Sequence, residues 1–419
     1  MSILNLIRHG AVDLPLVNST FTVLETSKTY SSSFVNVVDA CGISDKRYLF
    51  CTSNSNNTNA NGGCSNIFWI DSSGSKVANR GNPSVSNAIY GGYPSSFRID
   101  TTGTYAGIIY NSYDSSVTAV KYIALLDLNN NLYYNKFLYG YSATKLVVDA
   151  SGNIYSTFDS GIGFIKIDNA GNLTMQYSLN NAPTMHGYDI ALDSSGNIYV
   201  AGASGTTGIV VKYTAAGAVV WQRSYTTVSG SNNAYIEVSK SSGKIFLIND
   251  KTLFCLDASG NILWQKSGST AYFYGVSVDY LDNVYTTSTG NIISKFDVSG
   301  NVIWQRTVTG EINGLGCRVD TITKSLFIFG AGSWTSSTFR VPLDGTKTGS
   351  YSGVAYGGGN QDRVYAAASL SFINNGYTSS PTSYTAASIS NFSINSGGWG
   401  NFGSMSSVGF TNTMTSMII

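Results

Sequence analysis

The sequence predicts an all-β fold built from one repeated unit, and two recurring turn markers lead to this prediction. The first marker is an Asp-x-x-Gly-Asn turn, or a degenerate form of it, that recurs at gaps of 39 to 61 residues. The second marker falls between these copies, and a bulky residue follows it seven positions later in five of the seven copies. The first marker lies at Asp39, Asp100, Asp149, Asp193, Lys240, Asp279 and Asp320, and the second at Asp71, Asp127, Asp168, Thr214, Asp257, Asp297 and Pro342.

The fourth copy shows how one unit divides into strands. Its runs begin at Tyr188, Asn197, Gly208 and Ala218, and β-branched and aromatic residues dominate them. The turns suit Asp, which bonds a backbone N–H two residues on, and Gly, which accepts positive φ. Four strands per unit, at a period of about 40–50 residues, are typical of a β-propeller blade. Seven copies therefore predict a propeller of seven four-stranded blades.

The bulky residues after the second marker have a packing role in this interpretation. They are Tyr134, Met175, Trp221, Trp264 and Trp304. An indole fills the space between two neighbouring sheets well, so we expect the tryptophans to lie as wedges between blades.

The repeat divides the chain into three parts. Residues 1–33 precede the first blade, and a strand candidate at 21–25 is expected to close the ring by pairing with the last blade. Residues 34–359 form the propeller, whose seventh blade runs from about Leu315 to Gly358. Residues 360–419 form a β-rich, Ser/Gly/Asn-rich extension that is expected to pack against the propeller or another subunit. Its candidate assembly residues are Trp399, Phe402, Phe410, Ile418 and Ile419.

The composition excludes some function classes. Charged residues make up 11% of the chain against roughly 25% in ordinary domains, and the net charge is +1. Without a basic patch, a nucleic-acid partner is not expected. The apolar stretch near the start of the sequence is too short and too interrupted by charges to be a secretory signal. No apolar run is long enough for membrane insertion. A neutral surface rich in Ser, Asn and Tyr, on a protein without a secretory signal, favours the interpretation that the protein is a virion component assembled in a host cytoplasm.

One stretch resembles a known repeat family. Asp193-Ser-Ser-Gly-Asn-Ile-Tyr-Val-Ala-Gly, followed by Val-Val-Lys-Tyr and Val-Val-Trp-Gln-Arg, resembles the bacterial β-propeller repeats called SBBP and, more distantly, the quinoprotein-like repeats. The resemblance covers residues 145–310 well and 34–140 and 311–358 weakly. It implies a propeller. The quinone and calcium of quinoprotein dehydrogenases are not implied, because the chain has no adjacent Cys pair and no acidic metal cluster.

Catalytic patterns are poor, so we predict no enzyme, no cofactor and no metal. The two histidines and the absence of HExxH, GxSxG, Walker A and CxxC leave only scattered carboxylates. Those off the turn markers are Asp159, Asp189, Asp250 and Glu311, and nothing in the sequence brings two of them together. Cys255 and Cys317 are expected to be buried thiols, whereas Cys51 and Cys64 could pair under oxidising conditions.

Aromatic residues in predicted connections form the candidate binding surface. The fourth-to-first and second-to-third connections of a propeller open on one face, and aromatic rings beside amides suit sugar rings or a protein partner. Alternatively, these rings plug the mouth of the ring and cover strand ends. The candidate ligand-binding residues are Tyr139, Tyr141, His186, Tyr188, Tyr235, Tyr272, Tyr274 and Trp334.

Three functions remain open from the sequence. The first is a non-enzymatic structural or attachment protein of a virus particle, with a bacteriophage tail, fibre or capsid-surface component as the expected case. Its partners are other virion proteins or further copies of itself, and host-surface glycan is a further candidate. The second is a glycan-binding lectin or adhesin. The third, and weakest, is a polysaccharide-degrading enzyme with paired carboxylates.

Overall fold

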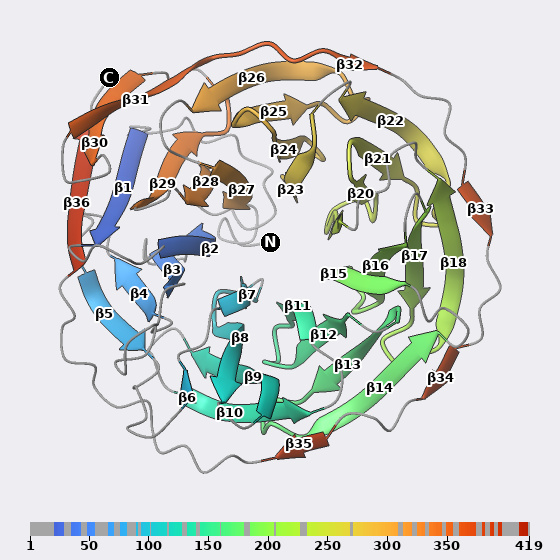
Figure 1. The fold of residues 1–419 in the computed structure, drawn as a ribbon. Coiled ribbons are helices and arrows are strands. Elements are labelled where there is room, and N and C mark those ends of the chain that lie inside the picture. The colour runs from blue at the N-terminus through green and yellow to red at the C-terminus, as the bar shows by residue number, and fades with distance from the viewer. Residues whose placement is uncertain are drawn as a thin grey trace, which may run out of the picture.

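The predicted propeller is confirmed by the computed structural model (Figure 1). The described residues contain strands and turns and no helix. They are 21–28, 35–42, 48–54, 66–70, 76–81, 89–90, 94–100, 102–114, 117–127, 132–139, 143–159, 161–179, 185–204, 207–226, 233–268, 271–308, 313–320, 325–331, 335–345, 349–354, 360–373, 379–381, 386–388, 393–395 and 410–417.

Seven sheets are formed by the described strands, and they stand around one axis (Figure 1). Six of them contain four consecutive strands of the chain, in order from the axis outward, and we number these blades 1 to 6. Blade 1 is β2 (Val35–Gly42), β3 (Tyr48–Asn54), β4 (Asn66–Ile70) and β5 (Lys76–Gly81). Blade 2 is β7 (Pro94–Ile99), β8 (Tyr105–Asp114), β9 (Val117–Asp127) and β10 (Leu132–Tyr139), with β6 (Ile89–Tyr90) also paired to β8.

The central blades repeat the same order. Blade 3 is β11 (Ala143–Val148), β12 (Ile154–Phe158), β13 (Gly163–Ile167) and β14 (Leu173–Leu179). Blade 4 is β15 (His186–Leu192), β16 (Ile198–Ser204), β17 (Thr207–Tyr213) and β18 (Val219–Thr226). Blade 5 is β19 (Ala234–Val238), β20 (Ile245–Asn249), β21 (Thr252–Leu256) and β22 (Ile262–Gly268). Blade 6 is β23 (Phe273–Val278), β24 (Val284–Ser288), β25 (Ile292–Phe296) and β26 (Val302–Val308).

Blade 7 is assembled from both ends of the chain. It contains β27 (Asn313–Asp320), β28 (Ser325–Ala331) and β29 (Thr335–Pro342), and its fourth strand is β1 (Phe21–Lys28), which pairs antiparallel with β29. The repeat had assigned residues up to Gly358 to this blade, and that assignment is wrong at its end. Because β1 occupies the edge of β29, β30 (Gly349–Val354) instead forms a hairpin with β31 (Asn360–Ala367) on the edge of blade 6.

The C-terminal extension forms what we call the belt, defined as strands β31 to β36. They run around the outside of the ring against the order of the blades (Figure 1). After β31 on β26 come β32 (Phe372–Ile373) on β22, β33 (Ser379–Pro381) on β18, β34 (Ala386–Ser388) on β14, β35 (Ser393–Asn395) on β10 and β36 (Phe410–Met417) on β1. An open outer edge exposes unpaired backbone groups, and the belt covers six such edges.

The Asp turns join the strands as their chemistry predicts. In blade 4, Oδ1 of Asp193 accepts the backbone N–H groups of Ser195 and Asn197, both at 2.9 Å, and Oδ2 accepts the Asn197 amide at 2.8 Å. The degenerate copy in blade 5 was assigned one residue too late. Ser239, and not Lys240, starts that turn. The backbone N–H of Ser239 donates to the carbonyl of Lys244 at 2.9 Å, so this turn is one residue longer than the turns of the other blades.

The core lies between the blades, as expected for sheets packed face to face. Phe164 of blade 3 and Tyr213 of blade 4 are buried edge to face, with ring centroids 5.0 Å apart. The wedge role of tryptophan is confirmed as well. Nε1 of Trp264 in blade 5 donates to the carbonyl of Val298 in blade 6 at 2.9 Å, and Trp221 makes the same bond to Ala258 at 3.0 Å. Cys255 and Cys317 are buried thiols, as predicted.

Candidate functional site

Three candidate tyrosines stand around the propeller axis at one face of the ring. We call this the loop face, because the fourth-to-first and second-to-third connections open there. The sequence placed Tyr235 and Tyr274 in connections, and this placement is wrong, because β19 and β23 already include them. Tyr188, at which the sequence began a strand, lies in β15. The three residues therefore lie on the innermost strands of blades 4, 5 and 6, near the ends that reach the loop face. All three are partly exposed.

Two of these tyrosines are set out of the regular strand pattern by β-bulges. The pairing of β15 with β16 shifts between Gly187 and Asp189, and that of β23 with β24 shifts between Phe273 and Gly275. Tyr188 and Tyr274 are the extra residues at these shifts. A bulge bends the strand and re-aims the side chain, and bulges are common beside functional sites. The alternation rule for strands therefore could not place these rings from sequence.

His186 begins β15 and is exposed. Its Nδ1 contacts the carbonyl oxygen of Asp159 in blade 3, and since a carbonyl only accepts, Nδ1 donates. The close approach of the two blades depends on Gly187, since a Cβ there would lie 2.7 Å from the Phe158 carbonyl oxygen. The imidazole centroid lies 6.1 Å from that of Tyr188, so the two rings form one aromatic pair.

Tyr235 and Tyr274 are close enough to influence each other. Burial raises the pKa of Tyr235 to about 12, with further contributions from Asp189 and Tyr274. Asp189 is 4% exposed, and its Oδ2 accepts the N–H of Ile236 at 3.0 Å. This bond ties the innermost strand of blade 4 to that of blade 5, beside Tyr235. The phenol is therefore a neutral donor at physiological pH, held on a fixed backbone.

Tyr272 extends the aromatic surface outward from the axis. Its side chain is 39% exposed, and the ammonium of Lys251 lies 4.4 Å from the ring centroid. Its backbone N–H donates to Oγ1 of Thr289 at 2.6 Å, and its carbonyl accepts the Thr289 N–H at 2.9 Å. A cation over a phenol face and a doubly fixed backbone give this ring a defined orientation.

An ion pair that the sequence did not predict lies further along the innermost strands. Arg318 of β27 and Glu237 of β19 approach to 3.5 Å, with blade 6 between their two blades in the ring. Each residue lies two positions before the start of its blade's first turn, which is the sequence signal that could have found it. The pair joins blades 5 and 7 on the axis side, at the end of the strands away from the loop face.

The remaining candidate residues are less well placed. Tyr139 is the last residue of β10 and pairs with Ser393 of β35, so it lies in a strand and not in a connection. Phe410 begins β36 and pairs with Lys28 of the same chain. Tyr141, Trp334, Trp399, Phe402, Ile418 and Ile419 lie outside the described residues.

Carboxylates and other side chains of the types that bind metal ions are scattered over the described part of the chain. Asp159 follows β12, Asp189 lies in β15 and Asp250 follows β20, each in a different blade, and Glu311 lies outside the described residues. Both Asp189 oxygens accept backbone N–H groups, those of Ile190 and Ile236 at 3.0 Å. Within the described residues, no group of three His, Cys, Asp or Glu side chains is placed to hold a metal ion. A search of the same residues for a helix able to span a membrane found none.

Comparisons with known proteins support the fold. No protein-family model matches the chain, and no curated protein matches it in sequence. A catalytically inactive virginiamycin B lyase from Staphylococcus aureus, solved with quinupristin, superposes with a TM-score of 0.52 at 12% identity over 77% of this chain and 99% of that one. The Swd1 β-propeller domain from Myceliophteria thermophila gives 0.51 at 9% identity, over 75% and 99%. At such identities the likeness shows the β-propeller fold alone.

Proposed function

We propose that this protein is a non-enzymatic attachment protein that binds its ligand at the loop face of blades 4 to 6. The observation that carries the proposal is the gathering of aromatic rings there on fixed backbone. Tyr188 and Tyr274 are presented by bulges, Tyr235 is anchored beside Asp189, and His186 and Tyr272 are exposed beside them.

The chemistry of this surface favours a carbohydrate or a protein loop as ligand. Phenol and imidazole rings offer flat apolar faces together with hydrogen-bonding groups at their rims. A pyranose ring presents the matching pattern, with C–H groups on its face and hydroxyls around its edge. Lys251 above Tyr272 adds a positive charge at the outer side of the surface, which suits an acidic sugar.

The setting that we propose is the surface of a virus particle. Charged residues make up only 11% of the sequence, and the belt covers outer strand edges on blades 2 to 6 and on blade 7. Covering these edges protects a protein that must persist outside the cell, because exposed strand edges invite aggregation. A glycan-binding adhesin outside any particle is the second candidate, and it rests on the same aromatic surface.

The ligand experiment is a calorimetric binding titration of the full chain with neutral and acidic oligosaccharides. Binding is expected to fall at least tenfold in Tyr274→Ala and in Tyr272→Ala. Tyr133→Ala is the matched control, since Tyr133 is 49% exposed but lies on the outer strand β10. Unchanged binding in both loop-face variants would contradict the proposed site.

Two further readouts separate the function classes. Product analysis after long incubation with bound oligosaccharide is expected to show no cleavage, and a new reducing end would establish an enzyme instead. Co-sedimentation of the protein with particles is expected if it is a virion component. Sugar binding without any particle association would favour the adhesin.

A further inference from the structure

Lys251 of blade 5 makes a contact with Tyr272 that differs from the other lysine–tyrosine contacts of the propeller. Its ammonium lies 4.4 Å from the centroid of a phenol ring that is 39% exposed at the loop face. Other lysines lie over tyrosine rings that are at most 4% exposed. These pairs are Lys166–Tyr155, Lys212–Tyr199 and Lys295–Tyr285. Lys251 is therefore placed over a ring that a ligand can reach.

The buried pairs serve the fold, because each of their phenols also donates a hydrogen bond to the Asp of its blade's first turn, at 3.1 or 3.2 Å. Within the described residues, the phenol oxygen of Tyr272 makes no hydrogen bond of this kind. Lys251 likewise forms no ion pair with a described carboxylate, whereas the ammonium of Lys212 lies 3.9 Å from Asp193. The cation and the phenol at the loop face are thus placed to bind a ligand.

The backbone around Lys251 holds the ammonium in place. The carbonyl of Lys251 accepts the N–H of Gly268 at 3.0 Å, and the carbonyl of Asp250 accepts the N–H of Phe273, next to Tyr272, at 3.0 Å. Asp250 closes the tight turn between β20 and β21 at φ 57°, a conformation that non-glycine residues rarely adopt. Because ordering a lysine side chain costs conformational entropy, an ammonium that is already held over a ring loses less on binding an anion.

The nearby carboxylates are less accessible than this cation. Asp250 is 1% exposed and Asp189 is 4% exposed, so both side chains are buried. The two oxygens of Asp189 already accept backbone N–H groups at 3.0 Å. Lys251, in contrast, is partly exposed. A ligand over Tyr272 therefore meets the ammonium of Lys251 before either of these carboxylates.

We propose that the ligand of the loop face is an acidic carbohydrate whose anionic group is bound by Lys251. This inference rests on the proposed function and narrows its ligand to sugars that carry a carboxylate or a sulfate ester. The anionic group pairs with the ammonium, and the sugar ring lies against the exposed part of Tyr272, whose phenol bonds the sugar hydroxyls. Lys251 determines the specificity for acidic sugars, whereas the aromatic rings bind neutral and acidic sugars alike.

The test is a calorimetric titration of the full chain with three oligosaccharides of equal length, one neutral, one with a uronic acid and one with a sulfate ester. At least one acidic form is expected to bind about tenfold more tightly than the neutral form, as for a hydrogen bond to a charged group. This preference is expected to shrink as the salt concentration rises, which tests the charge without any substitution.

Lys251→Gln is expected to remove the preference for the acidic form and to leave binding of the neutral form unchanged. Lys251→Arg is expected to keep the preference, because it keeps the cation. Lys166→Gln is the matched control, since Lys166 lies over the buried ring of Tyr155 in blade 3. This control is expected to bind all three oligosaccharides as the unaltered chain does.

The outcomes separate this inference from the proposed function. Equal or tighter binding of the neutral form overturns the inference and leaves carbohydrate binding standing. A Lys251→Gln variant that keeps the acidic preference, or that weakens binding of all three forms equally, also overturns it, because the cation then does not select the ligand. Absence of binding to all three forms overturns both. Where the preference holds, the tighter of the two acidic forms identifies whether a carboxylate or a sulfate is recognised.

Discussion

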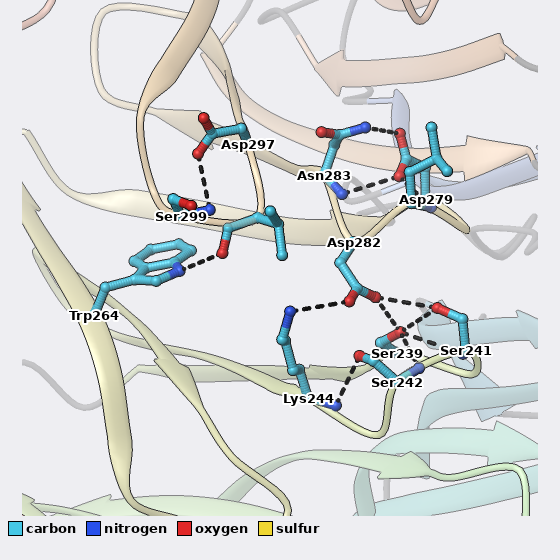
Figure 2. A network of polar contacts seen from close by, with 12 residues as sticks. Ser239, Ser241, Ser242, Lys244, Trp264, Asp279, Asp282, Asn283, Asp297 and Ser299 are labelled. Atoms are coloured by element: carbon cyan, nitrogen blue, oxygen red, sulfur yellow. Dashed lines mark hydrogen bonds and ion pairs between the residues drawn. The ribbon is translucent and has the colours of Figure 1, made fainter.

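Asp282 of blade 6 and Lys244 of blade 5 form an ion pair across the boundary between two blades, with Nζ and Oδ2 3.2 Å apart (Figure 2). Asp282 is one of three non-glycine residues with positive φ in the described part of the chain, and it adopts φ 63° at the turn position that Gly152 and Gly196 fill in other blades. Its carboxylate also accepts hydrogen bonds from the hydroxyls of Ser239 and Ser241. The blade 5 turn has Ser239 where the turns of other blades have Asp, and the neighbouring blade contributes a carboxylate to it.

The first prediction concerns this substitute carboxylate. Asp282→Asn is expected to lower the free energy of unfolding by about 1–3 kcal/mol, because it removes a charged partner of Lys244 at a site that is 6% exposed. Asp297→Asn, in an exposed turn of the same blade, is the control and is expected to cost about 0.5 kcal/mol or less. Equal losses in the two variants, measured by denaturant unfolding, would show that the contact between blades contributes nothing.

The second prediction concerns acid stability. Burial works to raise the pKa of Asp257, but hydrogen bonds from Asn261 and Ser259 and the charge of Arg223 outweigh it and lower the pKa below its ordinary value. The pKa values of Asp168, Asp193 and Asp297 are also lowered, by hydrogen bonds that outweigh burial. A lowered folded-state pKa stabilises the protein fully above the unfolded value of about 3.9, and this is lost as pH falls through the folded pKa.

The melting temperature is therefore expected to stay level from neutral pH down to about pH 5 and to fall below about pH 4. Asp257→Asn should flatten the acid limb of this curve. A loss of stability centred above pH 5 would instead point to other titrating groups.

The third prediction concerns the contact between wedge and turn. Gly300 has φ 81°, and a Cβ there would lie 2.8 Å from Cδ2 of Trp264. Gly243 has φ 73° but no atom within 4 Å of an added Cβ. Gly243→Ala is therefore expected to cost only the backbone strain of roughly 1–2 kcal/mol, whereas Gly300→Ala adds a clash of roughly 1–3 kcal/mol. Thermal unfolding that ranks the two variants equally would remove the steric role assigned to the indole.

The fourth prediction concerns how the belt is fastened. The side chain of Gln305 in β26 forms two hydrogen bonds with the backbone of Leu370. Its Nε2 donates to the carbonyl oxygen at 3.1 Å, and its Oε1 accepts the backbone N–H at 2.6 Å. Gln305→Leu is expected to speed amide exchange at Leu370 at least tenfold, since a leucine offers neither group. Thr307→Val, on the same strand but bonded through its side chain to Gly290, should leave that exchange unchanged.

The fifth prediction concerns removal of most of the belt. A chain that ends after Ala367 retains β31 but loses β32 to β36, and with them the strand partners on blades 2 to 5 and the second partner of β1. We expect a lower melting temperature and concentration-dependent aggregation, because five outer edges become open. A shortened chain that remains as stable and soluble as the full chain would show that the belt neither stabilises the ring nor protects its outer edges.

The blades could be predicted from sequence because their turns depend on local chemistry. Asp193, Gly196 and Asn197 form one hydrogen-bonded turn within five residues, so each copy identifies itself. The belt could not be predicted in the same way. Strands as short as Ser379–Pro381 show no periodicity, and their pairing depends on an edge built more than 150 residues earlier, at Arg223 to Tyr225.

The candidate site was only partly predictable for a similar reason. The sequence identified the aromatic residues, but the bulges at Tyr188 and Tyr274 depend on how each innermost strand pairs with its neighbour. The Arg318–Glu237 ion pair needs the closed ring, because its residues come from blades that are not adjacent. The shared position of the two residues before the first turn of each blade becomes informative only once the closed ring has brought blades 5 and 7 together.

The pairing of β1 with both β29 and β36 determines the order in which the blades can form during synthesis. β1 is the first described strand to leave the ribosome, and its two partners lie more than 300 residues later in the chain. Blades 1 to 6 can form in order as they emerge, whereas blade 7 must wait for β27 to β29. Contacts this distant in sequence fold slowly, so we expect the nascent protein to persist as an open arc that needs protection until β29 has emerged.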